Sequence, residues 1–365
     1  MQFAEINALY RAGDTIKSLA SAVAAIKEKT IEPEHIRDIV LLIIQGNHYE
    51  YFQDAMKFID ENVSIFEKDI DIQKAYAFAA WVYNDFNRCE ASSKKALSLN
   101  HEDPGVYSTL GMLYLTHTKY TEAFMALSAG MLFCKDKNGL VPWLKLATLL
   151  MKGIHEVHFT FDGLQFTFLL SCFNGQAMES SATHISGTLC EKEELLYIRH
   201  ELSHCDVILE CGSLVGNHTV FFLKALGPKK IIIFDADKES INQTRKNFEL
   251  NAVGQSSATE LILYCKAVGD KKGETLIYSK KFEVTTLDSE IHEKIDFIKI
   301  DVDGMELEVL RGAQSIIKTY KPKIMVEVKN TSEVEFYKVL DEIGYTVIRK
   351  FIRNTDSNYY ITPKN

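Results

Sequence analysis

The chain has 365 residues, too many for one ordinary hydrophobic core, and its length predicts two or three domains. Hydrophobic residues make up 46% of it and charged residues 25%, a balance typical of globular proteins that excludes extensive disorder. The formal net charge of -9 gives no electrostatic reason to expect a nucleic-acid partner.

Cysteine spacing and hydropathy indicate in which cellular compartment the protein is expected. The seven cysteines are scattered, and no two show the close spacing of a zinc site or a thioredoxin-type motif. The N-terminal stretch MQFAEINALYRAGD lacks the basic start and apolar run of a signal peptide. The longest purely aliphatic run, residues 39–44, is far too short to span a bilayer. We therefore expect a soluble, cytoplasmic protein without a membrane span.

Residues 1–151 have helical periodicity and predict an all-α domain. The segment that starts at Pro104 matches the tetratricopeptide pattern, with Tyr in the Trp position and Leu in the Phe position. The matching residues are Tyr107, Leu110, Gly111, Tyr114, Tyr120, Ala123 and Leu127. One period of about 34 residues earlier, the equivalent positions hold Ala77, Ala80 and Cys89. Small residues there let two antiparallel helices approach closely.

The rest of this domain matches the repeat less well. Helical hairpins are expected around residues 5–28 and 35–62. The alternative is a plain helical bundle, since apolar residues at helical spacing are more often core than repeat. The Leu-Gly-x2-Tyr core and its offset favour a tetratricopeptide-like array. Such arrays bind a partner chain in their concave face or serve in self-association, and the residues favour neither role.

Residues 152–204 are expected to lead from the helical domain into the next one. The segment 157–170 alternates in polarity, and Asp162-Gly163 is a strong signal for a two-residue hairpin turn. A polar stretch follows, and then a helix over 191–202. The sequence thus predicts a β-hairpin and a linker helix.

From residue 205 to 365, strands and helices alternate, which predicts a doubly wound α/β sheet. The strands are expected at 207–211, 231–235, 261–265, 297–301 and 324–328, and the helices at 219–226, 240–251 and 306–318. Segments 345–351 and 359–362 would close the sheet as an antiparallel pair. In such sheets, ligands bind at the carboxyl ends of the strands.

The first strand ends in a candidate cofactor loop. Gly212 and Gly216 lack a Cβ, so the loop turns sharply and its backbone can approach a ligand. Their Gly-x3-Gly spacing differs from the Gly-x-Gly-x2-Gly of dinucleotide enzymes. An acidic Glu210 suits the cationic amino-acid end of S-adenosylmethionine better than a pyrophosphate. The predicted cofactor contacts here are Glu210, Gly212, Ser213, Gly216, Asn217 and His218.

The second strand ends at Asp235, followed by Ala236. A carboxylate in this place can accept hydrogen bonds from ribose hydroxyls. NAD enzymes use the same device, so Asp235 indicates an adenosine cofactor without choosing which.

Residues 296–313 hold the most specific motif. A buried strand delivers Lys299 and Asp301 to its carboxyl end, and Gly304 opens the next helix. Asp303 and Glu306, three residues apart, also form a helix-capping pattern, which is a structural alternative for both. Asp301 has no such structural explanation. It is expected to lie beside the methyl group of the cofactor, so it is also a predicted cofactor contact.

These residues resemble the FkbM-type methyltransferase family over roughly residues 190–350. The resemblance rests on Asp301-Val-Asp-Gly-x-Glu306-x2-Val-Leu-x-Gly312-Ala, with Thr286-Leu-Asp288 before it, Ala267-Val-Gly-Asp-Lys-Lys-Gly273 and Glu327. It implies a class I, Rossmann-like methyltransferase fold with a seven-stranded, mostly parallel sheet, and S-adenosylmethionine as cofactor, with Ala267 among its contacts. It also implies methylation of hydroxyls, often on sugars or natural products. Where the family usually has Asp-x-Gly-Ala-Asn and Glu-Pro, this chain has Glu210-Cys-Gly-Ser-Leu and Asp235-Ala236, which keep the acidic charge.

A hydroxyl is a poor nucleophile and gains from a base. Asp301 is the first choice for that base, followed by Glu306 and Glu327, while His218 is a weaker candidate. Asp301 and Asp303 could hold a divalent cation, but the sequence shows no third ligand, so a metal is not indicated.

Three other functions stay open or are disfavoured. An NAD-linked oxidoreductase would need the tighter glycine motif and a Tyr-x3-Lys proton donor, and the sequence has neither. A protein methyltransferase whose repeats hold the substrate stays open. So does an interaction module with a weakly active or vestigial methyltransferase fold. The favoured partner is a small-molecule or glycan acceptor, with a protein partner or self-association through the repeats.

Overall fold

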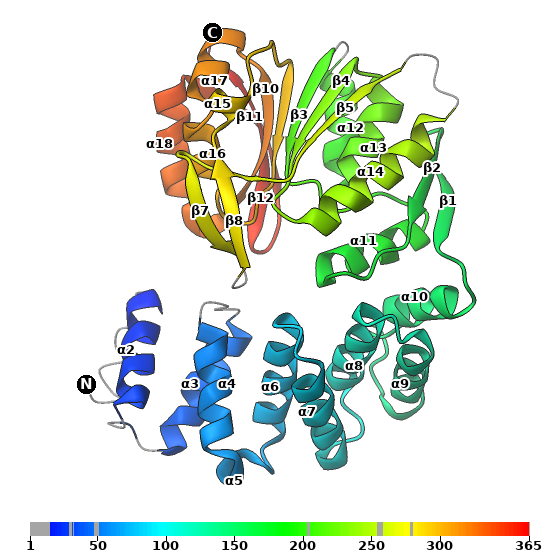
Figure 1. The fold of residues 1–365 in the computed structure, drawn as a ribbon, viewed down its shortest axis with the longest axis vertical. Coiled ribbons are helices and arrows are strands. Elements are labelled where there is room, and N and C mark those ends of the chain that lie inside the picture. The colour runs from blue at the N-terminus through cyan, green and yellow to red at the C-terminus, as the bar shows by residue number, and fades with distance from the viewer. Residues whose placement is uncertain are drawn as a thin grey trace. The chain divides into compact units, whose positions relative to one another are not determined.

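A computed structural model describes residues 15–28, 31, 33–46, 51–202, 205–253, 258–277 and 280–364. The chain divides into two compact units, Met1–Gly153 and Ile154–Asn365 (Figure 1). Within the described ranges, no helix combines the length and the apolar character that crossing a membrane requires.

The described part of the N-terminal unit is helical. Its helices are α2 (Thr15–Lys27), α3 (Pro33–Gln45), α4 (Phe52–Glu61), α5 (Val63–Phe66), α6 (Ile70–Val82), α7 (Phe86–Leu99), α8 (Pro104–Thr116), α9 (Tyr120–Phe133) and α10 (Val141–Met151). The hairpin expected around 35–62 is the pair α3 and α4. Of the hairpin expected around 5–28, residues 1–14 lie outside the described ranges, and 15–27 form one helix.

Close packing of α8 and α9 depends on two glycines. A Cβ on Gly111 would lie 2.6 Å from the side chain of Leu127, and one on Gly130 would lie 2.9 Å from Tyr107. These separations are well below van der Waals contact, so the helices meet at a distance that only glycine allows. The close approach expected at Gly111 is confirmed.

The second unit begins with the predicted hairpin, β1 (Glu156–Phe161) and β2 (Leu164–Leu169). Asp162 and Gly163 both have positive φ, 48° and 76°, as the expected two-residue turn requires. Helices α11 (Gly175–Ile185) and α12 (Lys192–Glu201) follow. Phe166 and Phe168 of β2 belong to the same buried cluster as Ile208 of the main sheet. The hairpin is therefore part of this unit's core.

The main sheet has seven strands in the order β11-β12-β10-β9-β3-β4-β5 (Figure 1). They are β3 (Val207–Cys211), β4 (Lys230–Phe234), β5 (Glu260–Tyr264), β9 (Phe297–Ile300), β10 (Lys323–Lys329), β11 (Tyr345–Ile352) and β12 (Asp356–Pro363). Strands β10, β9, β3, β4 and β5 run parallel, and β12 runs antiparallel to both β10 and β11. This is the predicted Rossmann-like, mostly parallel sheet.

Two layers of helices cover the sheet. Ile208, Phe297 and Met325 pack in one buried cluster with residues of α12 and of α13 (Asn217–Leu226). Helix α14 (Lys238–Ala252) contributes to the same layer. Leu209, Ile298 and Val326, the alternate residues of the strands, pack in a second cluster with α17 (Gln314–Tyr320) and α18 (Glu333–Ile343). The shorter elements are α15 (Leu287–Glu290), α16 (Glu306–Arg311) and the 3-10 turn η2 (Asn330–Ser332).

The prediction of a single helix over 306–318 is wrong. The segment forms two helices, α16 and α17, which are separated at Gly312 because the carbonyl of Gly312 accepts a hydrogen bond from the Asp288 amide (3.0 Å). The Asp288 carboxylate then accepts from the amides of Ser315 and Ile316, at 2.8 and 3.0 Å, and caps α17. A Cβ on Gly312 would lie 2.0 Å from the carbonyl oxygen of Gly269, so the break requires glycine.

A small three-stranded sheet was not predicted. Strand β8 (Lys280–Thr285) lies between β6 (Ala267–Val268) and β7 (Gly273–Ile277). The sequence over 274–292 shows no motif, because charged residues interrupt the alternation that would indicate strands.

Candidate active site

A row of polar side chains lies on one face of the main sheet. In the parallel register, Glu210 of β3 pairs with Lys299 of β9, and Lys299 pairs with Met325 of β10. Because side chains alternate along strands, Asp301 and Glu327, each two residues further, lie on the same face. That face is the one that α12 and α13 cover. Apolar residues fill the first half of each strand, and the polar row follows toward the carboxyl ends.

The predicted cofactor loop, residues 212–216, is shaped by both glycines. Gly212 has a φ of +84°, and a Cβ there would lie 1.7 Å from the carbonyl oxygen of Asp301. Gly216 has a φ of +76°, and its Cβ would lie 3.1 Å from Thr244 of α14. Only glycine combines this conformation with this proximity. The loop therefore lies directly against the backbone that follows β9.

Glu210 is fully buried, and only one of its two carboxylate oxygens has a hydrogen-bond donor among the described residues. Its Oε2 accepts a hydrogen bond from Thr219 Oγ1 (2.6 Å). Its Oε1 has no hydrogen-bond partner among the described residues. Burial raises the pKa of this carboxyl, and the charges of His218 and Lys299 oppose that rise. A buried acceptor without a donor is costly, so this oxygen points to a donor supplied by a ligand.

Asp235 holds the cofactor loop. Its Oδ2 accepts from the amides of Ser213 (2.9 Å) and Leu214 (3.0 Å), and its Oδ1 accepts from the amide of Asp237 (2.9 Å). Ala236 is half-buried beside it. Ala267, also predicted to contact the cofactor, is buried in β6 and pairs with Val284 of β8. Asp235 thus joins the ends of β3 and β4.

The side chains of Asn217 and His218 are already engaged. The Asn217 carboxamide accepts from the Cys190 amide (3.1 Å) and donates to the Cys190 carbonyl (3.2 Å). Its oxygen also lies 3.0 Å from His184 Nε2. His218 Nε2 lies 2.9 Å from Glu191 Oε2. Both residues thus tie the first turn of α13 to the segment that precedes α12.

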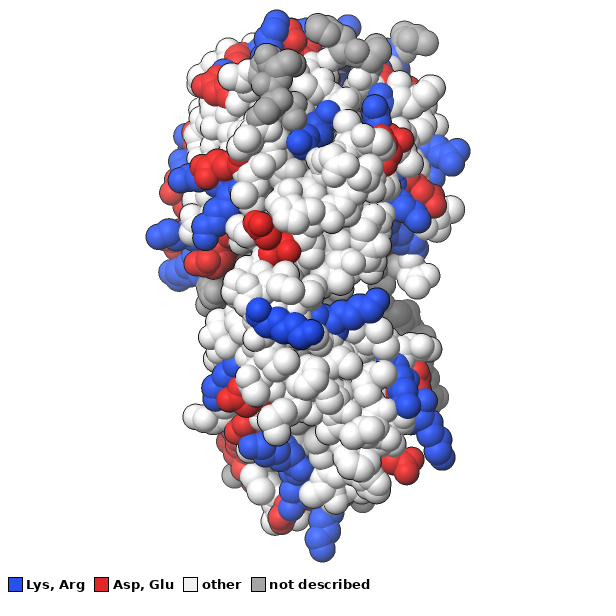
Figure 2. Space-filling view, turned by 90° about the vertical axis from the view of Figure 1, so that its right-hand side faces the viewer, with Lys and Arg blue, Asp and Glu red and all other residues white. Residues whose placement is uncertain are grey.

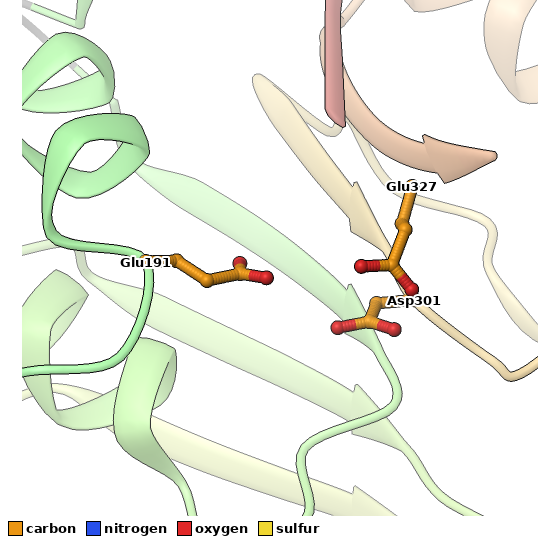
Figure 3. Close-up of side chains that lie close together, drawn as sticks. All are labelled: Glu191, Asp301 and Glu327. Atoms are coloured by element: carbon orange, nitrogen blue, oxygen red, sulfur yellow. The ribbon is translucent and has the colours of Figure 1, made fainter. Parts of the chain in front are cut away.

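Three carboxylates meet at the carboxyl ends of β9 and β10. One oxygen from each of Glu191, Asp301 and Glu327 lies within 4.8 Å of the others. Figure 3 shows Glu191 reaching toward the other two from the opposite side. Sequence reasoning missed Glu191, because no spacing relates it to Asp301. The geometry could hold a metal ion.

Two cations also contact this group. Lys299 Nζ donates to Asp301 Oδ2 at 2.6 Å. Arg353 Nη1 lies 2.6 Å from Glu191 Oε1 and 3.4 Å from Glu327 Oε1. Its Nη2 donates to Glu194.

The pKa values of the carboxyls diverge. Burial, with the nearby Asp301 charge, raises the pKa of Glu327 to about 9. Burial also acts to raise the pKa of Glu191, but its hydrogen bond to His218 and the His218 charge hold that pKa well below its usual range. At neutral pH, Glu327 therefore carries a proton and Glu191 does not.

The turn after β9 is stabilised by the side chains of Asp303 and Glu306. Asp303 and Gly304 have φ of +55° and +109°. Glu306 is buried, and its Oε1 accepts from the Gly304 amide at 2.7 Å. The helix-capping pair expected of Asp303 and Glu306 is wrong, because the N-cap of α16 is Met305. The Asp303 carboxylate does not cap α16; it accepts from Gln176 Nε2 of α11 at 3.3 Å. The structure does not place Asp303 or Glu306 with the group of three carboxylates.

Comparison with known proteins shows what the chain is similar to. Among solved structures, the chain is similar to methyltransferase FkbM from Methylobacillus flagellatus KT, with 14% identity over 74% of this chain and 65% of that one, at a TM-score of 0.38. It is also similar to ribosomal protein L11 methylase from Lactobacillus delbrueckii subsp. bulgaricus, with 15% identity over 47% and 78%, at 0.36. A third is precorrin-6y C5,15-methyltransferase from Geobacter metallireducens GS-15, with 11% identity over 48% and 90%, at 0.35.

No curated protein matches the chain. The model of the methyltransferase FkbM domain matches residues 210–353, which include the cofactor loop, Asp235 and the motif after β9. Residues 210–353 are therefore similar to the methyltransferase FkbM domain, and a helical region, α2 to α10, lies earlier in the chain.

Proposed function

We propose that the protein is an S-adenosylmethionine-dependent methyltransferase that methylates a hydroxyl of a sugar, a glycan or a small natural product. The unpartnered Oε1 of Glu210 carries this proposal. It is a buried carboxylate oxygen next to a glycine loop, where the ammonium group of the cofactor would supply the missing hydrogen bond and an opposite charge. A pyrophosphate in its place would be repelled.

The residues fit the cofactor. Gly212 and Gly216 keep the loop free of Cβ atoms, so backbone amides can face the ligand. The carboxylate of Asp235 lies at the end of β4, where ribose hydroxyls would share it with the loop amides. Ala236 and Ala267 remain the proposed contacts nearby. When bound, the cofactor supplies an electrophilic methyl group on a sulfonium.

The chain's own residues handle the proton. Asp301 takes the proton of the acceptor hydroxyl, since it is the carboxylate that Lys299 orients at the end of β9. Glu327, already protonated at neutral pH, instead donates a hydrogen bond to the acceptor. Glu306 stays a component of the turn. Asp301→Asn should keep cofactor affinity and lose turnover; unchanged turnover would refute this assignment.

The acceptor is proposed to be a small molecule or glycan, not a nucleic acid. The formal net charge is -9. On the face shown in Figure 2, basic and acidic side chains are interspersed, and no broad basic field appears among the residues drawn there. Nucleic-acid binding relies on such a field. For the helical unit, we propose a tetratricopeptide-like array over 1–151, with 152–204 leading into a catalytic domain over 205–365.

Calorimetric titration tests the cofactor. The purified protein should bind S-adenosylmethionine and S-adenosylhomocysteine, and not NAD. Glu210→Gln should weaken both adenosyl ligands at least about tenfold, because it removes the charge that faces the ammonium group. Glu249→Gln, at an exposed position on α14, is the matched control and should change nothing. A folded wild type that binds neither ligand would contradict the proposal.

A further inference from the structure

Glu191 lies outside the matched residues 210–353 and directly precedes α12, yet its side chain reaches the active site. Its backbone is left-handed, with φ of +55° and ψ of 40°, a conformation that residues other than glycine rarely adopt. Its carboxylate does not cap its own helix. The Glu191 side chain instead contacts residues far away in the chain.

Those contacts lead to the cofactor loop. Glu191 Oε2 lies 2.9 Å from Nε2 of His218, which is the second residue of α13. The next residue, Thr219, donates its hydroxyl to Oε2 of Glu210 at 2.6 Å. One helical turn therefore connects Glu191 to the carboxylate proposed to bind the ammonium group.

Backbone contacts reinforce this connection. The amide and carbonyl of Cys190, directly before Glu191, both bond to the Asn217 carboxamide. On its other oxygen, Glu191 contacts Arg353 at 2.6 Å and accepts from Asn358 Nδ2 at 3.3 Å. The segment before α12 is thus fixed to the start of α13, to β12 and to the turn that precedes β12.

We infer that Glu191 is a positioning residue of the cofactor site. Resting on the proposed function, the inference is that its carboxylate holds His218, and with it the first turn of α13, in the place from which Thr219 orients Glu210. Cofactor affinity then depends on a residue outside the methyltransferase domain as the family model delimits it. The dependence is confined to the amino-acid end of the cofactor, because Asp235, at the ribose end, has no contact with Glu191 among the described residues.

Two ligands separate this role from a general structural one. S-adenosylhomocysteine carries the amino-acid end, and adenosine lacks it. Titrating the full-length chain, we expect Glu191→Gln to weaken S-adenosylhomocysteine at least about tenfold while adenosine affinity changes less than about twofold. Glu193→Gln, an exposed substitution on the same helix, should leave both affinities unchanged. Circular dichroism checks that each variant is folded. If Glu191→Gln does not fold, His218→Asn removes the same imidazole–carboxylate contact from the other side and must meet the same criterion.

Other results overturn the inference. It fails if Glu191→Gln binds S-adenosylhomocysteine as tightly as Glu193→Gln does. It also fails if the variant loses both ligands in the same proportion, since a general loss of structure would do this. A wild type that binds no S-adenosylhomocysteine refutes the proposed function itself, which distinguishes the two failures.

Discussion

Glu191, Asp301 and Glu327 share a small, half-buried space. Like charges at this separation cannot all persist where water is scarce. Lys299 bonds to Asp301, and Arg353 bonds to Glu191, so these two carboxylates have cationic partners at short range. Among the described residues, Glu327 contacts a cation only through Arg353, at 3.4 Å. It is the carboxyl whose pKa is raised to about 9 by burial and by the Asp301 charge.

This raised pKa predicts a pH-dependent stability. Between the ordinary pKa of a Glu, 4.5, and about 9, the unfolded chain loses the Glu327 proton and the folded chain keeps it. The residue therefore makes the protein less stable as pH rises through this window. We expect Glu327→Gln to gain free energy of unfolding relative to wild type, by about 1 kcal/mol or more, between pH 5 and pH 8.

Urea unfolding at both pH values measures this gain. Glu249→Gln, exposed on α14, is the control and should show no pH-dependent difference. A constant difference between Glu327→Gln and wild type at pH 5 and pH 8 would show that Glu327 is ionised in the folded protein.

Sequence patterns identified those site residues whose position follows from the residues next to them in the chain. Glu210 lies near the carboxyl end of β3, and Asp301 directly follows β9, as predicted. Glu191 could not be found in this way, because its partners His218 and Arg353 are 27 and 162 residues away in the chain (218 − 191 and 353 − 191). The loop contacts of Asp235 were also missed, since they depend on how the loop folds back.

At the scale of elements, glycine sets how closely neighbours approach. Gly111 brings α8 against Leu127 of α9. Gly312 brings the break between α16 and α17 against the carbonyl of Gly269. The first was predictable, because a repeat pattern places small residues between paired helices. The second was not, because the bond from Asp288 that ends α16 comes from 24 residues earlier.

Gly111→Ala tests the packing of the helical unit. The added Cβ would lie 2.6 Å from Leu127 Cγ, so the side chain or the helices must move. We expect a loss of about 1–3 kcal/mol in the free energy of unfolding, which overpacking typically costs. Gly139→Ala is the control, since a Cβ there would meet nothing within 4 Å. Chemical denaturation of both variants gives the comparison, and equal stabilities would mean that α8 and α9 have room to spare.

The whole chain consists of two units, and the boundary after Gly153 differs from the start of the matched domain at residue 210. Sequence patterns predicted the two folds and the hairpin between them. They did not predict that the hairpin and α12 share the core of the sheet. Burial against a sheet leaves no local signature in segments whose own periodicity is short.

Truncation should reveal this shared core. A fragment of residues 154–365 keeps Phe166, Phe168 and Leu195 over the sheet and should unfold cooperatively on heating. A fragment of residues 205–365 exposes the surfaces that these residues cover, so it should aggregate or melt without a cooperative transition. Circular dichroism on heating distinguishes the two. A cooperative transition of the shorter fragment at the same temperature would show that the hairpin layer adds nothing.

Three side-chain carboxamides form hydrogen bonds as backbone peptide groups do, those of Asn217, Asn247 and Asn251. Each carboxamide donates and accepts at once: Asn217 on Cys190, Asn251 on Thr167, and Asn247 on the Leu169 amide and the Val215 carbonyl. An aspartate has the same shape but no hydrogen to donate, so loss of ammonia from one of these amides would set two oxygens against each other. Chemical ageing at these three positions would therefore detach the hairpin and the segment before α12 from the sheet domain while leaving its apolar core unchanged.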